Sequence, residues 1–330
     1  MIPSCVSRVA VLMSVIALVT SCVGDSPRER AMHSGAEAKL RVVVLDEGDK
    51  VVSNATVEVY FSLSVREGIT AKGVSDEMGM YGAKGKTTGD IYVSVSKNGY
   101  YPSEEKVDLS VDNERAVEHG RWLPNEIVTN IVLRKIGKPI QLVTTDLGKS
   151  YHFQEKDEVL GFDLEKMDWV APRGRGQTVD FEVRYESDGK RLFDFTGAKL
   201  HVRFVRPYDG AYRRRQNKVS KLKVDSVADT NGVYSSELEF YVEKTPDRKW
   251  VSNKVGKDEF LVLRTRSRTD GDGNFIGGHY SLVLGEWSFG WSRKAFGHMG
   301  LRSLFNPNFN DPNLEEMNIY NTPDFRAIGP

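Results

Sequence analysis

Glu165 and Asp168, which closely precede Trp169, are the residues in this sequence with the clearest catalytic chemistry. Two carboxylates beside an aromatic ring are the arrangement with which a glycoside hydrolase protonates a leaving oxygen and stabilises an oxocarbenium-like transition state. The chain holds 46 acidic residues, so neighbouring acids also arise by coincidence. A carbohydrate-active enzyme that uses these carboxylates is therefore an alternative hypothesis.

A second set of interest is the aromatic segment from Glu286 to Trp291. If this segment is extended, Trp287, Phe289 and Trp291 share one face. An exposed face of this kind would bind a carbohydrate or a protein. Alternating aromatic residues also build sandwich cores, because each buries roughly 150–250 Å² of surface. Both interpretations remain open from the sequence.

The sequence patterns of other catalytic and cofactor sites are absent. There is no Gly-x-Ser-x-Gly motif of a serine nucleophile and no glycine-rich phosphate or dinucleotide loop. The histidines lack the spacing of a hydrolytic metal site and are scattered at His33, His119, His152, His201, His279 and His298. The sequence therefore predicts no catalytic residue, no metal and no cofactor, and favours a protein that is not an enzyme.

The stretch Asp270-Gly271-Asp272-Gly273-Asn274 is rich in the oxygen donors that calcium prefers. An EF-hand loop ends in glutamate at its twelfth position, where this chain has Ser281. Strands are expected on both sides, at 261–266 and 280–284. We therefore predict a glycine-rich hairpin turn here, and a turn of similar kind at 308–311.

Basic residues gather between Tyr212 and Lys223. We predict a solvated loop or an edge strand, where Lys and Arg discourage pairing with another chain. Contact with anionic lipid headgroups or an acidic polysaccharide is the functional alternative. Over all 330 residues, 46 basic side chains balance 46 acidic ones, which argues against a nucleic-acid partner.

Residues 1–21 have the pattern of a secretory signal. Arg8 precedes an apolar run from Val9 to Val19, which is too short to cross roughly 30 Å of hydrocarbon as a helix. The only cysteines are Cys5 and Cys22, and Cys5 would be lost with the signal. The mature chain would then hold one thiol and no disulfide.

The end of this run, Val19-Thr20-Ser21-Cys22, resembles the lipobox of bacterial lipoproteins. The resemblance implies that the thiol of Cys22 takes up diacylglycerol and that acyl chains then anchor the protein, at about 0.8 kcal/mol per buried CH₂. It implies a place in the cell envelope, and in the outer membrane of a Gram-negative organism, because Val23 follows the cysteine rather than Asp. An ordinary cleaved signal peptide is the alternative.

From residue 39 to residue 136, apolar and polar side chains alternate with the period of half-buried strands. Residues 22–38 are small and polar and lack this pattern, so we expect a flexible tether there. Turn signals such as Asp76-Glu77-Met78-Gly79 separate the runs. The apolar members of the runs are Leu40, Val42, Val44, Ala55, Val57, Val59, Phe61, Ile91, Val93, Val95, Ile127, Ile131 and Leu133.

The order of these pieces resembles the carboxypeptidase regulatory-like domain, a small transthyretin-like β-sandwich. The resemblance is carried by an acidic-glycine turn after Val42–Leu45, by Ser75-Asp76-Glu77-Met78-Gly79 in place of a Thr-Asp-x-x-Gly turn, and by Lys97-Asn98-Gly99-Tyr100. Domains of this family are non-catalytic accessory or spacer modules, so the resemblance implies such a role for residues 39–136.

Residues 137–330 form the second predicted domain, after a linker at Gly137-Lys138-Pro139-Ile140. Alternation resumes there with sizeable loops between the runs, so we predict a larger antiparallel β-sandwich or an open barrel. The apolar members are Phe181, Val183, Tyr185, Leu200, Val202, Phe204, Leu238, Phe240, Val242, Leu261, Leu263, Tyr280, Leu282 and Leu284.

Three segments, 136–140, 161–172 and 305–315, resemble a group of uncharacterised bacterial envelope proteins with the same two-part arrangement. The last segment follows the group's pattern Asn-Pro-x-x-Asn-Asp-x-Asn-Leu-Glu, whereas Gln141-Leu142 departs from the Met-Tyr of its linker. The resemblance supports the architecture and implies no activity.

We therefore expect an all-β, lipid-anchored protein of the cell envelope with a non-catalytic binding, structural or assembly role. Its expected partners are the membrane, through the lipid at Cys22, and a glycan or an envelope protein.

Overall fold

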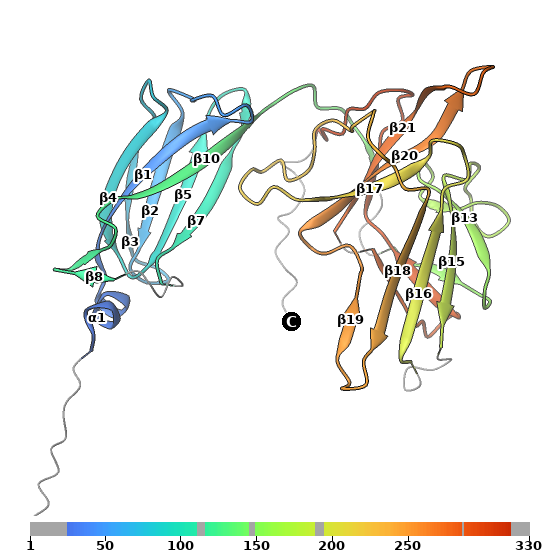
Figure 1. Cartoon of the computed structure of the whole chain (residues 1–330), viewed down its shortest axis with the longest axis horizontal. Helices are drawn as coiled ribbons and strands as arrows, with labels where there is room; N and C mark the ends of the chain where they lie inside the picture. The colour runs from blue at the N-terminus through green and yellow to red at the C-terminus, as the bar shows by residue number, and fades with distance from the viewer. Residues whose placement is uncertain (1–24, 111–115, 145–148, 189–194, 286, 318–330) are drawn as a thin grey trace, which may run out of the picture.

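The computed structural model describes residues 25–110, 116–144, 149–188, 195–285 and 287–317. The chain is mostly β-strand, in several antiparallel sheets that form sandwich-like domains (Figure 1), so the all-β prediction is confirmed. Cys22 and the signal segment lie outside the described residues. No helix within the described ranges is long and apolar enough to cross a membrane.

The first domain is a sandwich whose two sheets enclose one core. Its strands are β1 (Ala36–Asp46), β2 (Thr56–Ser62), β3 (Gly68–Val74), β4 (Met80–Thr87), β5 (Asp90–Ser96), β6 (Tyr100–Tyr101), β7 (Ser103–Asp108), β8 (Val117–Glu118), β9 (Arg121–Trp122) and β10 (Ile127–Lys135). One sheet has the order β6-β10-β1-β9-β8, with β4 also paired to β1, and the other has the order β3-β2-β5-β7. Alternate side chains of β1 and β2, such as Val42 and Val57, are fully buried between them.

A flexible tether is expected at residues 22–38, but the described part of this range contains a helix and the start of a strand. Helix α1 (Pro27–Ser34) occupies part of it, and β1 begins at Ala36. Ser26 and Glu29 form a reciprocal capping box, in which the backbone N–H of each residue donates to the side chain of the other. Such a cap satisfies backbone donors that the helix leaves free, and Ala31 is buried against the domain. Capping rather than an apolar stripe therefore stabilises this helix.

The second domain contains three sheets. Its strands are β11 (Val143–Thr144), β12 (Tyr151–Phe153), β13 (Val159–Asp163), β14 (Asp168–Trp169), β15 (Phe181–Ser187), β16 (Gly197–Arg203), β17 (Gly210–Arg215), β18 (Glu237–Lys244), β19 (Trp250–Ser252), β20 (Glu259–Thr269), β21 (Phe275–Leu284), β22 (Ser288–Gly290), β23 (Gly297–Gly300) and β24 (Ser303–Phe305). The sheet orders are β14-β13-β15-β16-β18-β19, β11-β24-β21-β20-β17 and β12-β23-β22.

The sheet that contains β20 is buried on both faces. Leu261 and Leu263 point into the core shared with β15 and β16, whereas Phe260 and Val262 point into a second cluster on the opposite face. Burial on both faces accounts for the continuous apolar run at these positions. The second cluster also contains Tyr101 of the first domain, so the two domains share buried side chains.

Candidate functional site

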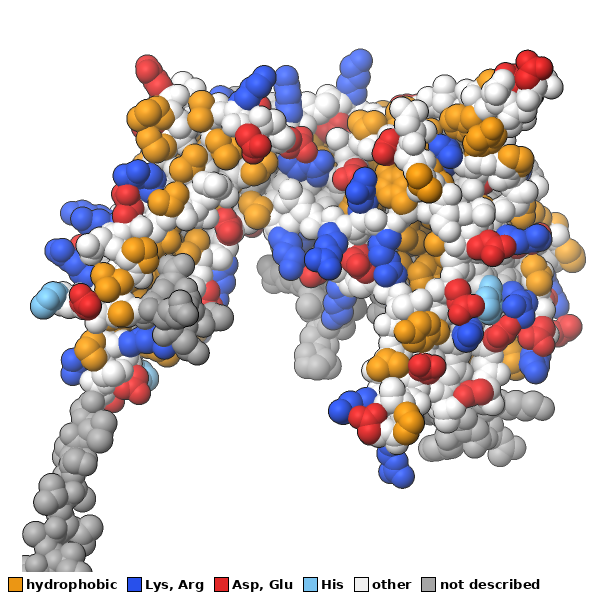
Figure 2. Space-filling view, viewed as in Figure 1, with side chains coloured by type: hydrophobic (Ala, Val, Ile, Leu, Met, Phe, Trp, Pro, Cys, Tyr) orange, Lys and Arg blue, Asp and Glu red, His pale blue; other side chains and the backbone are white. Residues whose placement is uncertain are grey.

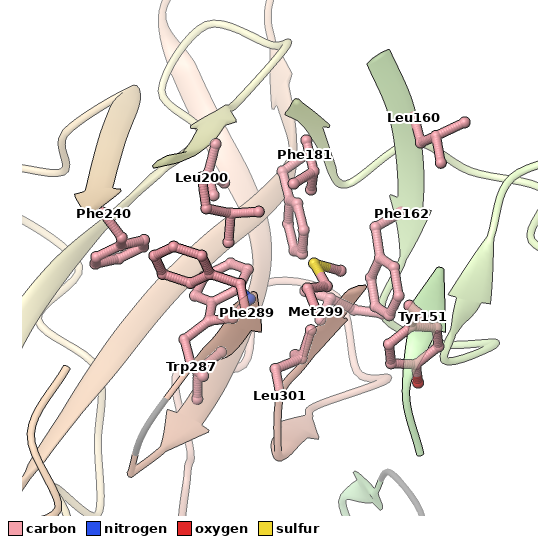
Figure 3. Packing of buried hydrophobic residues seen from close by; sticks show 14 of the residues in the cluster. Tyr151, Leu160, Phe162, Phe181, Leu200, Phe240, Trp287, Phe289, Met299 and Leu301 are labelled. Atoms are coloured by element: carbon pink, nitrogen blue, oxygen red, sulfur yellow. The ribbon is translucent and has the colours of Figure 1, made fainter. Parts of the chain in front are cut away.

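The aromatic segment 287–291 lies mainly in the core of the second domain. Trp287 is 0% exposed and Phe289 is 4% exposed. The Trp287 ring lies 5.5 Å from that of Phe181 and 5.6 Å from that of Phe240, measured between ring centroids (Figure 3). Trp291 is half-buried. The three side chains therefore do not form the exposed face that binding at this segment requires.

Glu165, Asp168 and Trp169 do not present the free carboxylates and exposed ring that a sugar-binding site requires. Trp169 is buried, and its ring contacts that of Phe162 edge to face at 5.5 Å. Asp168 Oδ2 lies 3.4 Å from Nε of Arg175. Glu165 is paired with Arg266. The carboxylates are thus paired with cations, and the aromatic ring that would contact a sugar is in the core.

Arg266 is the centre of a buried charge cluster that no local sequence pattern indicates. The register between β20 and β21 shifts next to this residue, and its φ is 53°. A bulge of this kind redirects a side chain, and the guanidinium contacts Asp180 through Nε at 2.8 Å and Nη2 at 3.0 Å. It also reaches Asp163 at 2.9 Å and Glu165 at 2.5 Å.

The acids around Arg266 respond to burial in different ways. Burial raises the pKa of Asp180, and the hydrogen bonds from Arg266 oppose that shift. Burial also acts on Asp163, but backbone N–H donors, with Gln177 first, outweigh it and hold the pKa of Asp163 below its ordinary value. Asp209 completes the cluster by accepting the backbone N–H groups of Arg266 and Ser267, at 3.1 and 2.8 Å. The hydrogen bonds of the cluster hold the bulge in place. Because its carboxylates are already paired within the protein, the cluster suits a structural role.

The oxygen-rich stretch 270–274 is the turn of the β20–β21 hairpin, as predicted. Asp270 Oδ1 accepts the backbone N–H groups of Asp272 and Asn274, at 2.9 and 2.8 Å. Hydrogen bonds from Asn274 hold the pKa of Asp270 below its ordinary value. Over the ranges that the structure describes, no group of three or more His, Cys, Asp or Glu side chains could hold a metal ion.

The basic segment 212–223 begins in β17 and continues against the first domain. β17 is the last strand in its sheet order, so residues 212–215 lie in an edge strand as predicted. The rest of the segment is not a solvated loop, because Leu222 is fully buried. Further along, the backbone N–H of Lys221 donates to Pro102 O at 2.9 Å, and that of Glu104 donates to Val219 O at 2.8 Å. Lys and Arg side chains gather between the two domains in Figure 2. This segment is therefore part of the domain junction.

The C-terminal segment 306–317, which carries the Asn-Pro-x-x-Asn-Asp-x-Asn-Leu-Glu pattern, forms the other part of the junction. Glu315 Oε1 accepts hydrogen bonds from the hydroxyl of Tyr101 at 2.6 Å and from the N–H of Gly137 at 2.9 Å. The N–H of Ile140 donates to Glu315 O at 2.8 Å. The segment thus joins the first domain, the linker and the second domain.

The outer face of the β3-β2-β5-β7 sheet carries a hollow of about 350 Å³, which we call the tyrosine groove. Its aromatic residues are Tyr60 of β2 and Tyr92 of β5, which are paired across the strands with ring centroids 6.2 Å apart. Tyr92 is 44% exposed. Alternate side chains of a strand point to opposite faces of the sheet, so these tyrosines point away from the core. In the sequence, the groove is therefore indicated by the residues that alternate with the buried apolar ones.

Comparisons with known proteins add little to this geometry. No protein-family model and no curated protein matches the chain. The solved structures that match include 3-chlorocatechol 1,2-dioxygenase from Rhodococcus opacus, with 12% identity, a TM-score of 0.25 and coverage of 32% of this chain and 62% of the other. Chlorocatechol 1,2-dioxygenase from Pseudomonas putida matches with 14% identity, a TM-score of 0.25 and coverage of 31% and 61%. These matches span less than two thirds of the dioxygenases, and at such TM-scores they carry no argument.

Proposed function

We propose that this chain is a lipid-anchored protein of the cell envelope with a non-catalytic binding or assembly role. The lipobox-like segment 19–22 makes Cys22 the lipid attachment site, and the absence of Asp at residue 23 favours the outer membrane in a Gram-negative cell. The observation that carries the proposal is the place of α1. Cys22 precedes its capping residue Ser26 by four positions, and α1 packs at the end of the first domain away from the second (Figure 1).

The domain junction supports a role in presenting a surface at a distance from the membrane. Tyr101 is fully buried in a cluster that contains Leu222 and Leu314 of the second domain. Arg134 of β10 donates to Leu222 O at 2.8 Å. Buried contacts of this kind oppose free movement of the domains, so an anchor at Cys22 would hold both domains as one body.

A binding role is favoured over catalysis by the surroundings of the acidic residues. Glu165 and Asp168, on which the carbohydrate-active alternative depends, are paired with Arg266 and Arg175. The tyrosine groove, in contrast, presents exposed aromatic and hydroxyl groups to solvent.

Labelling of growing cells with radioactive palmitate tests the anchor. The wild-type protein is expected to take up label and to fractionate with membranes, and Cys22→Ser is expected to lose both properties. Cys5→Ser is the matched control, because the lipid would be attached only to Cys22; it should behave like the wild type. Unlabelled wild-type protein, or a Cys22→Ser variant that fractionates unchanged, would overturn the proposal.

A further inference from the structure

The tyrosine groove continues into a longer track along β2 and β5. Three cross-strand pairs follow one another on the outer face, and they are Tyr60↔Tyr92, Glu58↔Ser94 and Thr56↔Ser96. Their first and last members are four residues apart, which corresponds to roughly 13 Å of strand. A second hollow of about 680 Å³ begins at the last pair and is also lined by Asn54, Asn98 and Tyr100.

The charges around the three cross-strand pairs are matched within the face or at its border. Lys72 Nζ lies 3.4 Å from Glu58 Oε2, and Lys106 Nζ lies 2.9 Å from Asp90 Oδ1. At the edge of the sheet, Lys221 of the second domain pairs with Glu104 at 3.1 Å. Lys97, which lines the second hollow, donates to Ser53 O at 2.7 Å, so the track carries one cation at its Tyr100 end. Along the rest of the track the cations are paired with acids, and the carboxylates would repel an anionic ligand.

The remaining groups fit a ligand with many hydroxyl groups. A tyrosine ring offers an apolar face together with a polar edge, and such a face can pack against the C–H groups of a sugar ring. Serine, threonine and asparagine side chains both donate and accept hydrogen bonds, and a carboxylate accepts them. The middle pair is Glu58↔Ser94, and glutamate and serine are both depleted in protein–protein interfaces.

We propose that this track, from Tyr60 and Tyr92 to Tyr100, binds an uncharged oligosaccharide that lies along the strands. The inference rests on the binding role proposed above and names its ligand class. The sugar rings pack on the tyrosines at the two ends, and the hydroxyl groups in between bond with Thr56, Ser94 and Ser96.

Binding of the purified full-length protein to an oligosaccharide panel tests this inference. The probes are neutral oligomers of glucose, mannose and N-acetylglucosamine, with oligogalacturonic acid as the acidic probe, and the measurement is isothermal titration calorimetry in detergent. At least one neutral oligomer is expected to bind, and the acidic oligomer is expected to bind at least tenfold more weakly. Failure of every neutral probe to bind, or a preference for the acidic one, would overturn the inference.

Variants then place the ligand on the track. Tyr60→Ala with Tyr92→Ala should weaken binding at least tenfold, whereas Tyr208→Ala should not, although Tyr208 of the second domain is similarly exposed at 45%. Ser96→Arg leaves the tyrosines in place and obstructs the track, so it should have a comparable effect, with Thr269→Arg as its surface control. Circular dichroism melts verify that each variant is folded. Unchanged binding in the folded Ser96→Arg and double-tyrosine variants would refute this location.

The two proposals fail separately. Cys22→Ser should keep the affinity for the oligosaccharide, because the lipid is not part of the track. Palmitate labelling without any glycan binding would leave the anchor and remove the ligand class, and glycan binding without labelling would do the reverse.

Discussion

The hydroxyl of Tyr101 and the carboxylate of Glu315 meet at 2.6 Å, although 214 positions separate them in the sequence. Tyr101 belongs to β6 of the first domain and is fully buried. Glu315, which is 1% exposed, also accepts the N–H of Gly137 in the linker. One carboxylate thus connects the first domain, the linker and the C-terminal segment.

Tyr101→Phe removes the hydroxyl from this contact and leaves the ring in place. We expect the free energy of unfolding to fall by roughly 1–3 kcal/mol, because the buried carboxylate loses a donor. Limited proteolysis should cut the linker at 137–140 faster than in the wild type. Tyr60→Phe is the control, since its hydroxyl lies on the outer sheet face. Equal cleavage rates in the two variants would show that the contact does not hold the junction.

Arg266→Met is expected to destabilise the second domain. It leaves Asp163 and Asp180 buried without their cation, and breaking a buried pair in this way costs about 3–5 kcal/mol. Arg266→Lys should be intermediate, because an ammonium cannot form the two bonds that Asp180 receives. Urea denaturation measures the free energy of unfolding of both variants. Arg203→Met, at a surface pair with Glu182, should have little effect, and a similar loss there would contradict the importance of burial.

The environment of His279 leads us to expect that the free energy of unfolding depends on pH. Burial holds the pKa of His279 below its ordinary value of 6.5, and the neighbouring Arg266 adds to the shift. As the pH falls through 6.5, the unfolded chain takes up a proton that the folded imidazole does not. The stability is therefore full above this pH and falls as the solution becomes more acidic.

Thermal melts between pH 7.5 and pH 5 test this prediction. His279→Gln should lose part of the dependence, whatever its effect on stability at pH 7.5. His119→Asn alters an exposed imidazole and should keep the wild-type slope, with asparagine accepted at the positive φ of this position. If the melting temperature of His279→Gln changed with pH as steeply as that of the wild type, the pH dependence would arise from other groups.

Trp287→Ala distinguishes a core role from a binding role for the aromatic segment. Removal of a fully buried indole should lower the free energy of unfolding by about 3–5 kcal/mol. Trp250→Ala is the matched control at a side chain that is 50% exposed, and it should cost much less. Oligosaccharide binding should survive in both variants if they are folded. Loss of binding in a stably folded Trp287→Ala protein would favour a ligand site at this segment.

Strands with one buried face could be predicted closely from the sequence. Burial of every second side chain imposes period two, and the runs that begin at Ala55 and Phe181 correspond to β2 and β15. The hairpin turn at 270–274 also followed from local chemistry, because an aspartate accepts the N–H groups two and four positions later. In both cases the information lies within a few residues.

The remaining features depend on contacts between distant positions. Gly82 and Gly85 interrupt the pattern of β4, and Gly85 is explained by Phe61 of another strand, whose ring lies 2.5 Å from where a Cβ would stand. Arg266 finds its buried acids 86 and 103 positions away. The tyrosine groove likewise requires the register between β2 and β5. None of these pairings has a local signal, so only the folded chain reveals them.

The parallel pairing of β1 with β10 determines how the first domain would respond to mechanical force. A pull between a lipid at Cys22 and the second domain would enter at the start of β1 and leave at the end of β10. The two strands would then be sheared along their length, and the seven residue pairs from Leu40↔Ile127 to Asp46↔Leu133 would resist together instead of unzipping one by one. A chain attached in this way would tolerate tension between its anchor and its second domain.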